Sequence, residues 1–293
     1  MIYSNEILDL IEAVKVIDKI TDEEWQKSLN ARKIKEIEFH DRDRDESFKQ
    51  ETLKSNDTFE QFYGNRKYYK ATKRSKSYVQ NWIAKESKGK VFLDYACGNG
   101  HNAIHACKSG AKLTLGFDIS GISIKNAVKS AEKENLMINK ENGICFFQAD
   151  AENTKLPDNC IDAVICSGML HHLDLSYSFP ELRRILKPNG KILALESLDY
   201  NPAIKLYRML TPDMRTEWEK AHILSLKDVN FASRFFSIDE IRYWHVLGYI
   251  GAKLTLLFPL LDNIDRFIEK IPYLQRLAWI FTFVMRKEGN NDA

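Results

Sequence analysis

The chain has 293 residues, of which 44% are hydrophobic and 29% charged, with a formal net charge of +2. This length suits one large domain or a domain with an appendage, and the small net charge gives no general attraction to nucleic acid or acidic membranes. The cysteines lack CxxC or CxxH spacing, so reduced thiols in a cytoplasmic protein are expected and a zinc site is not. No apolar run reaches the roughly 18 residues of a membrane span, and acids within the N-terminal apolar stretch argue against a signal peptide.

The first region, residues 1–88, is predicted to be helical and polar. Two series of apolar residues recur at helical spacing, and each indicates one helix. The first series is Ile7, Leu10, Ile11, Val14 and Ile17, and the second is Trp25, Leu29, Ile34 and Ile37. We therefore expect a helical extension ahead of the main domain.

From residue 90 the pattern changes to five short apolar runs, which are typical of buried parallel strands. The runs are 90–96, 112–119, 143–150, 161–168 and 190–197. Helices are predicted between them, over 101–109, 120–135 and 176–186. This alternation predicts an α/β domain with a parallel sheet and helices on both faces.

The C-terminal region, 201–286, is predicted to add helical elements to this sheet. Helices are expected around 233–249, a strand over 250–258, and an amphipathic stretch from 260 to 285 that breaks at Pro272. We expect the final helices, with Trp279, Phe281 and Phe283, to form core or a homodimer surface rather than a membrane anchor.

A glycine turn, "LDYACGNG" at 93–100, follows the first strand. A phosphate-binding P-loop is excluded, because no Lys-Ser/Thr pair follows Gly100. A dinucleotide turn stays open on the glycines alone, since Gly98, Gly100 and Ala103 fit GxGxxG/A. Asp94 decides between the ligands, because its carboxylate would repel a pyrophosphate and suits a cationic amine.

Two further acids come at the ends of the next strands. Asp118 can accept hydrogen bonds from both hydroxyls of a ribose. Asp150 can accept one from an adenine amine, and Ala151 can donate its backbone N–H to the ring. Acids for an amine, a ribose and an adenine together describe S-adenosylmethionine as the cofactor.

The stretch from about 90 to 198 resembles class I S-adenosylmethionine-dependent methyltransferases. "LDYACGNG", "GFDIS", "QADAENTKLP" and "IDAVICSGMLHHL…ELRRILKPNGKILALES" match the motifs of that family in order and spacing. Ala96 is a departure, because many relatives carry glycine there, although a small residue should still fit. The resemblance implies a Rossmann-like, seven-stranded mixed sheet whose last, antiparallel strand would be "KLTLLF". It also implies these cofactor-binding residues: Asp94, Ala96, Gly98, Gly100, Asp118, Ile119, Asp150, Ala151 and Ser167.

His171 and His172 follow the fourth strand, where a transferred methyl group should emerge. Either imidazole has the pKa range of a general base, with His172 the first candidate. Packing or a cofactor contact is the alternative, because similar "HHL" stretches occur in relatives with very different substrates.

A charged segment, 38–48, groups His40 with several aspartates. A metal site is conceivable there, but Arg42 and Arg44 alternate with the acids, so a solvated, salt-bridged helix start is favoured. No metal is expected. The family resemblance adds a third interpretation, in which the N-terminal region 1–88 folds over the active site as a lid.

A basic segment, 65–76, places Arg66, Lys70 and Lys73 on one helical face near Tyr63 and Tyr69. Cations interleaved with aromatic rings can bind RNA, a small anionic substrate or the cofactor's carboxylate. A plain solvated face is the remaining alternative. Nucleic acid is not the expected partner, because the rest of the chain compensates the charge and no appended RNA-binding module is evident.

An insertion of about 199–231 follows the fifth strand, where this family places substrate-recognition helices. Its aromatic and basic residues suit either a pocket for a polar or carboxylate-bearing substrate or ordinary packing. The candidate substrate-binding residues are Tyr63, Arg66, Tyr69, Tyr200 and Arg215.

The prediction for the whole chain is a lid over 1–88 and, over 89–293, a domain that methylates an O or N atom of a small molecule. The alternatives are an RNA or protein methyltransferase and a non-catalytic cofactor-binding protein.

Overall fold

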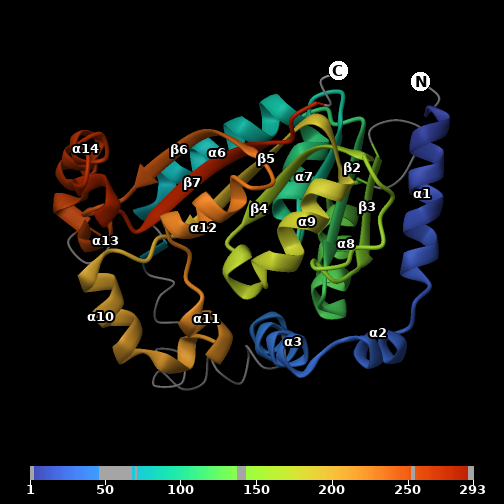
Figure 1. Ribbon diagram of the computed structural model, residues 1–293, viewed down its shortest axis with the longest axis horizontal. Coiled ribbons are helices and arrows are strands. Elements are labelled where there is room, and N and C mark those ends of the chain that lie inside the picture. The colour runs from blue at the N-terminus through green and yellow to red at the C-terminus, as the bar shows by residue number, and fades with distance from the viewer. Residues whose placement is uncertain (1–2, 46–67, 70, 137–142, 252–254, 290–293) are drawn as a thin grey trace.

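The structure is a computed structural model that describes residues 3–45, 68–69, 71–136, 143–251 and 255–289 (Figure 1). Its centre is a seven-stranded sheet with the order β3-β2-β1-β4-β5-β7-β6. The strands are β1 (Val91–Tyr95), β2 (Leu113–Asp118), β3 (Gly143–Gln148), β4 (Ile161–Ser167), β5 (Leu186–Ser197), β6 (Ser237–Trp244) and β7 (Ile280–Arg286). The first five are parallel, and β7 runs antiparallel between β5 and β6. The predicted seven-stranded mixed sheet is confirmed.

One face of the sheet is covered by α6 (Lys73–Ser87), α7 (His101–Lys108) and α8 (Gly121–Lys133). Trp82 and Ile83 of α6 pack on Phe92 of β1 and Ile165 of β4. Successive side chains of a strand point to opposite faces, so the neighbouring residues of these strands must pack against a second layer.

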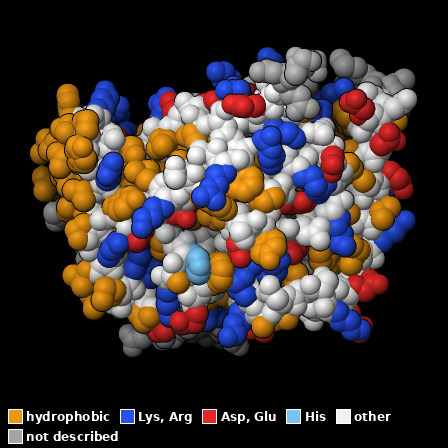
Figure 2. Space-filling model, in the orientation of Figure 1, with side chains coloured by type: hydrophobic (Ala, Val, Ile, Leu, Met, Phe, Trp, Pro, Cys, Tyr) orange, Lys and Arg blue, Asp and Glu red, His pale blue; other side chains and the backbone are white. Residues whose placement is uncertain are grey.

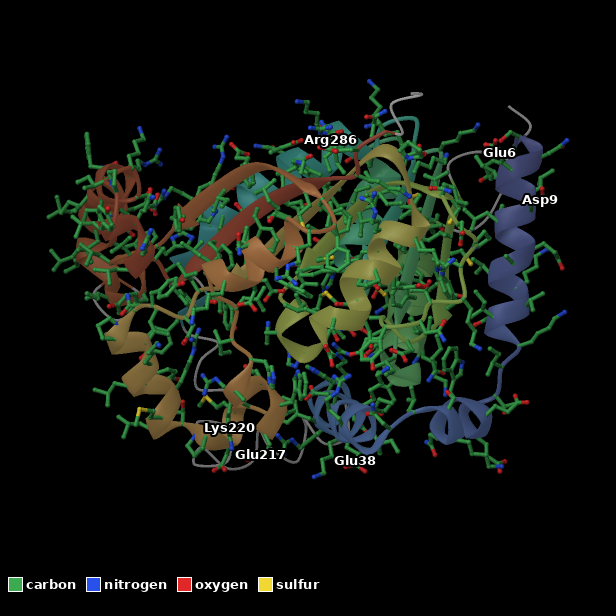
Figure 3. All side chains as sticks on the ribbon, viewed as in Figure 1. Glu6, Asp9, Glu38, Glu217, Lys220 and Arg286 are labelled. Atoms are coloured by element: carbon green, nitrogen blue, oxygen red, sulfur yellow. The ribbon has the colours of Figure 1, made fainter. Side chains whose placement is uncertain are left out.

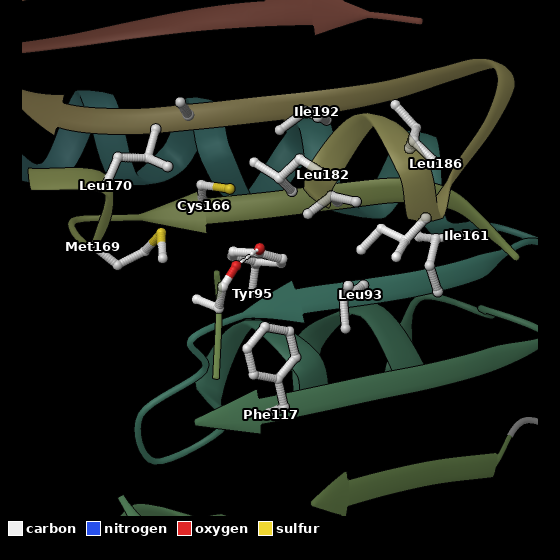
Figure 4. Close-up of a cluster of buried hydrophobic side chains, with 14 of the residues drawn as sticks. Leu93, Tyr95, Phe117, Ile161, Cys166, Met169, Leu170, Leu182, Leu186 and Ile192 are labelled. Carbon is white, nitrogen blue, oxygen red and sulfur yellow. Dashed lines mark hydrogen bonds between the residues drawn. The ribbon is translucent and has the colours of Figure 1, made fainter. Parts of the chain in front are cut away.

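The other face is covered by α1 (Asn5–Asp18), α9 (Leu175–Ile185) and α12 (Leu226–Ala232). Figure 4 shows the core on this face, where Tyr95 lies between Phe117 and Cys166. The Tyr95 hydroxyl is buried and donates to the backbone carbonyl of Ala151, which satisfies its only donor. Because β1 to β5 are parallel, their carboxyl ends lie along one edge of the sheet, where ligands bind in open α/β sheets.

The described part of the N-terminal extension is helical, as predicted, but the second predicted helix is in fact two. These are α2 (Asp22–Ser28) and α3 (Ala31–Arg44). Leu29 is extended, with ψ 144°, and the Asn30 side chain caps α3 by accepting from the Lys33 N–H. The segment predicted as a helix start at 38–48 is therefore the end of α3 in its described part.

The C-terminal strands lie where the sequence predicted helices. β6 replaces the helix expected around 233–249, and β7 replaces the helix expected at the end of the chain. In β7 six of seven residues are buried, and a fully buried run of this kind has no alternation that separates strand from helix. Trp279, Phe281 and Phe283 are buried, so the expectation that they form core is confirmed.

The predicted strand over 250–258 is wrong in its described part. The chain there forms α13 (Gly248–Gly251), η4 (Thr255–Leu257) and the start of α14 (Phe258–Ile268), followed by η5 (Leu274–Leu277). Pro259 in the first turn of α14 removes one backbone donor, which favours a helix start over a strand.

Four short elements complete the edge at which the strands end. They are η2 (Leu170–His172), α10 (Pro202–Leu210), η3 (Pro212–Met214) and α11 (Glu217–Ala221). Figure 3 shows Glu38 of α3 and Glu217 and Lys220 of α11 along the same side of the molecule. Among the described helices, none is both long and apolar enough to cross a bilayer.

Candidate active site

The turn after β1 depends on residues with positive φ. Ala96, Gly98 and Gly100 have φ angles of 55°, 53° and 77°. A Cβ on Gly100 would also lie 2.7 Å from Cζ of Phe146, which is closer than real Cβ contacts come. Glycine is therefore required at 100, while the positive φ at Ala96 is a conformation that glycine adopts more readily than alanine.

Asp94 lies beneath this turn and is only 1% exposed. Its Oδ2 accepts from the backbone N–H of Ala103 at 3.0 Å, which ties β1 to the first turn of α7. Burial raises the pKa of Asp94 to about 7, although the hydrogen bond from Ala103 opposes the shift. The charge that would attract an amine is therefore present at slightly alkaline pH and is lost as the pH falls.

Asp118, at the end of β2, holds the turn from the other side. Its Oδ2 accepts from the Gly98 N–H at 2.9 Å, and its Oδ1 accepts from the Ser120 N–H at 2.9 Å. Asp150 lies two residues beyond β3 and accepts from the Glu152 N–H at 2.9 Å. Both carboxylates are buried.

Helix α3 crosses this edge and donates to both acids. Arg44 Nη1 lies 3.1 Å from Asp118 Oδ1, and Lys33 Nζ lies 2.5 Å from Asp150 Oδ2. Lys33 also pairs with Glu152 at 2.8 Å, and Asp41 accepts from the Ser120 hydroxyl. The helix therefore covers the acids predicted to bind the cofactor.

The residues at this edge fit S-adenosylmethionine. The cofactor carries hydrogen-bond donors, namely an ammonium, two ribose hydroxyls and an adenine amine. The edge offers acceptors, of which Asp118 and Asp150 receive donors from α3. One further acceptor, Oδ1 of Asn99 in the glycine turn, is buried without a hydrogen-bond partner in the part of the chain that the structure describes. A buried acceptor without a partner is costly, so a ligand donor there would be stabilising.

A cavity of about 940 Å³ adjoins this edge beyond β4. Ser167 at the end of β4 lines it together with His171 and His172, and α3 closes it with Phe39 and His40. The remaining walls come from the end of β5, residues 68, 69, 72, 75 and 76, α10, the segment 214–223, α13 and the start of β7. A volume of this size suits a small molecule.

His171 is held by a buried glutamate. Its Nδ1 lies 2.6 Å from Glu196 Oε2, and Oε1 of the same carboxylate accepts from the N–H groups of Met169 and Leu170. Burial alone would lower the pKa of His171, but the Glu196 carboxylate outweighs it and raises the pKa. The arrangement orients the ring so that Nε2 is left for another partner, with Glu219 3.9 Å away.

His172 is held from the N-terminal extension instead. Its Nδ1 lies 2.9 Å from Glu36 Oε2, and Arg32 donates to its backbone carbonyl at 2.8 Å. The His40 ring packs against it at a centroid distance of 4.6 Å. Burial, and then the positive neighbours, lower the pKa of His40 well below its usual value, so that ring stays neutral.

Two arginines line the cavity from α10 and the loop after it. Arg208 lies 3.4 Å from Asp199 and Arg215 lies 3.6 Å from Glu219, which is longer than a good charge-assisted hydrogen bond. Burial, and then the charge of Arg215, lower the pKa of Arg208. These incompletely neutralised guanidinium groups favour an acidic ligand in the cavity.

The comparison with protein families decides the identity. Residues 93–194 match the methyltransferase domain family. This part of the chain is a class I S-adenosylmethionine-dependent methyltransferase domain. The matched range runs from the middle of β1 into β5, so it contains the glycine turn, all three acids and both histidines of this methyltransferase.

Curated relatives resemble this methyltransferase over part of their length. It is 32% identical over 108 residues to the ubiquinone/menaquinone biosynthesis C-methyltransferase UbiE of Acidiphilium cryptum (36% of this chain, 42% of the relative). It is 30% identical over 139 residues to the 2-phytyl-1,4-naphtoquinone methyltransferase of Nostoc punctiforme (46% and 58%). A ribosomal protein L11 methyltransferase of Photobacterium profundum is 29% identical over 104 residues (36% and 32%). The chain thus spans between about a third and three fifths of these relatives.

Solved structures share the fold. One is described as a sarcosine dimethylglycine methyltransferase from Galdieria sulphuraria. The alignment covers 74% of this chain and 88% of that one, with a TM-score of 0.52 and 14% sequence identity. The 4+2 cyclase SpnF aligns over 72% and 80%, with a TM-score of 0.51 and 17% identity. At this identity the likeness shows the fold alone, and a cyclase among these neighbours means that the fold does not determine the reaction.

The structure gathers many of the predicted site residues, though not all. Asp94, Asp118 and Asp150 lie along the edge with Ile119 and Ala151, while Ser167, both histidines, Tyr69 and Arg215 line the cavity. Tyr200 does not line it, since its hydroxyl accepts from the Leu226 N–H at 3.2 Å outside the cavity. Tyr63, Arg66 and Lys70 lie outside the described residues.

Several site residues were missed by the sequence analysis. Glu36 and Glu219 come from α3 and α11, and nothing in their local sequence marks them among the many other acids. Glu196 was recoverable, since it ends the fifth predicted strand at the same edge as the other acids.

The expectation of no metal remains a prediction. Within the described residues, Glu36, His40 and His172 place ligand atoms within 4.8 Å of one another, and so do His171, His172 and Glu219. Each of these groups also has a protein partner that accounts for it, as in the pair of Glu36 with His172 and the pair of His171 with Glu196.

Proposed function

We propose that this protein transfers a methyl group from S-adenosylmethionine to an O or N atom of a small molecule bound in the cavity. The observation that carries the proposal is that the cavity of about 940 Å³ opens beside His171 and Ser167, at the same strand edge as the cofactor acids. A methyl donor held by those acids and an acceptor held in the cavity would meet there.

The cavity supports an acceptor that combines an apolar or aromatic body with an acidic group. Tyr69 and Trp279 pack together at 5.4 Å on one wall, and Tyr68 and Tyr207 at 5.5 Å on another. The buried Arg208 and Arg215 side chains are 12% and 9% exposed. An acidic group on the acceptor would complete their hydrogen bonds, and the rings would hold its body.

The sulfonium of the cofactor supplies the electrophilic methyl group when it is bound. The chain then has to orient the acceptor, exclude water and remove a proton from an O or N nucleophile. His171 suits the last task, because its Nδ1–H donates a hydrogen bond to the Glu196 carboxylate, which leaves Nε2 as the base. We assign His172 to positioning, because Glu36 and Arg32 tie it to α3.

An RNA or protein methyltransferase is the alternative, and relatives named for ribosomal protein L11 give it weight. The volume of the cavity favours a small molecule, and side chains of α3, α10 and α11 line it. A non-catalytic cofactor-binding protein is a further alternative, and the paired His171 and Glu196 favour an enzyme over it.

The test is incubation with cofactor labelled in its methyl group and with separated small-molecule, RNA and protein fractions of a cell extract. We expect label in the small-molecule fraction, and much less with Asp118→Ala at subsaturating cofactor. Label in the RNA or protein fraction would mean that the methyl acceptor is RNA or protein rather than a small molecule. Cofactor binding measured by calorimetry with no label in any fraction would support the non-catalytic alternative.

A further inference from the structure

An apolar surface occupies the end of the molecule formed by α10, η4, α14 and η5. Figure 2 shows hydrophobic side chains gathered there, at the left of the view. Six large residues between 58% and 95% exposed define this apolar end: Met209, Leu210, Leu256, Leu260, Phe267 and Tyr273. Large contiguous apolar patches on a protein surface mark an interaction site.

Acids and cations of residues 256–277 differ in where their side chains lie. The three acids all contact the rest of the protein. Asp262 and Glu269 each pair with Arg74 at 2.6 Å, and Asp265 accepts from the N–H groups of Leu247 and Gly248. The three cations, Arg266, Lys270 and Arg276, are exposed, although Arg266 also lies 3.5 Å from Asp262. The outward face is therefore apolar with exposed cations, which is the pattern of helices that lie on membranes.

We infer that the apolar end docks on an anionic lipid bilayer. A second copy of the chain is a poorer occupant, because a two-fold contact would bring each cationic face against itself. Negative headgroups complement the cations instead, while Leu256, Phe267 and Tyr273 enter the interface.

The docked face adjoins the cavity. Ile250 of α13 lines the cavity and is also exposed beside the apolar end. Helix α10 contributes Ile204 and Tyr207 to the cavity, and Leu206 and Met209 to the outer surface. An acceptor with an apolar body could pass between bilayer and cavity without crossing water. The docking itself depends neither on that acceptor nor on the proposed methyl transfer.

The experiment is flotation of the full chain with vesicles of phosphatidylglycerol and, separately, of phosphatidylcholine. We expect binding to phosphatidylglycerol that weakens with salt, and far less to phosphatidylcholine. Leu256→Gln with Phe267→Gln should weaken it by roughly a hundredfold. The matched control is Leu8→Gln with Val16→Gln, which removes two exposed apolar residues from α1 at the opposite end of the molecule and should bind as the parent does.

No binding to phosphatidylglycerol, or an equal loss in both double variants, would overturn the inference. Sedimentation velocity is run in parallel. A dimer that dissociates in Leu256→Gln with Phe267→Gln, without vesicle binding by the parent chain, would assign the apolar end to self-association instead. Both variants change exposed side chains, so matching thermal unfolding confirms that any difference comes from the surface.

Discussion

The two halves of the site differ in what covers them. At the ends of β2 and β3, two of the acids that would bind the cofactor already receive donors from α3, namely Asp118 from Arg44 and Asp150 from Lys33. Beyond β4, the charged groups border a cavity of about 940 Å³. Cofactor binding must therefore exchange protein donors for ligand donors, whereas an acceptor can enter the other half without displacing a side chain from an acid.

The largest expected effect falls on the acceptor half. His171→Gln removes the proposed base, so kcat should fall by about 10²- to 10⁴-fold while cofactor affinity is unchanged. Initial rates and calorimetry measure the two quantities. His222→Gln is the matched control, because His222 stacks on Trp218 at 3.7 Å outside the cavity. An equal loss of cofactor affinity would assign His171 to the cofactor half.

The same residue predicts a pH dependence. Because Glu196 raises the pKa of His171, the basic form predominates only above that raised pKa, and kcat should fall as the pH drops through it. Glu196→Gln removes the cause of the shift, so this limb of the profile should move to lower pH. A profile that stays in place would mean that another group supplies the base.

The next effect falls on the cofactor half. Asp118→Ala leaves the ribose hydroxyls without their acceptor, which should weaken S-adenosylhomocysteine binding by about 10- to 100-fold. Calorimetry measures the loss. Asp158→Asn, which changes an exposed carboxylate that pairs with Arg184, is the control. Unchanged affinity in Asp118→Ala would place the ribose elsewhere.

Asp94 predicts a smaller, pH-dependent effect. Its pKa of about 7 means that the carboxylate is ionised above that pH and neutral below it. An ammonium is held better by the ionised form, so cofactor affinity should rise with pH and fall by up to about tenfold per pH unit below the pKa. Titrations with Asp94→Asn should be flat over the same range. A matching slope in the variant would move the effect to another group.

The smallest effect tests α3 itself. Arg44→Met removes a donor that competes with the cofactor for Asp118, so affinity should improve by up to about fivefold. Lys35→Met, which changes an exposed cation of the same helix outside the cavity lining, is the comparison. Weaker binding in Arg44→Met would show that α3 helps to hold the cofactor, as a lid closed over it would.

The sequence by itself determined the half of the site that would bind the cofactor. Asp94, the glycine turn, Asp118 and Asp150 lie within one continuous stretch, and each follows a strand whose apolar run is readable. Because parallel strands end at one edge, their order along the chain already predicts that these acids meet. The same reasoning predicted the five parallel strands and the helices between them.

Only the tertiary structure decided the acceptor half and the cover. Arg44 and Asp118 are 74 residues apart, Lys33 and Asp150 are 117, and Thr216 and Glu36 are 180. No local periodicity encodes such pairs, since they depend on where the extension folds back. The sequence did not predict the last two strands of the sheet, β6 and β7, for a related reason. β7 is buried on both faces and β6 lies at the edge, so their apolar patterns follow from packing against other strands rather than from their own sequence.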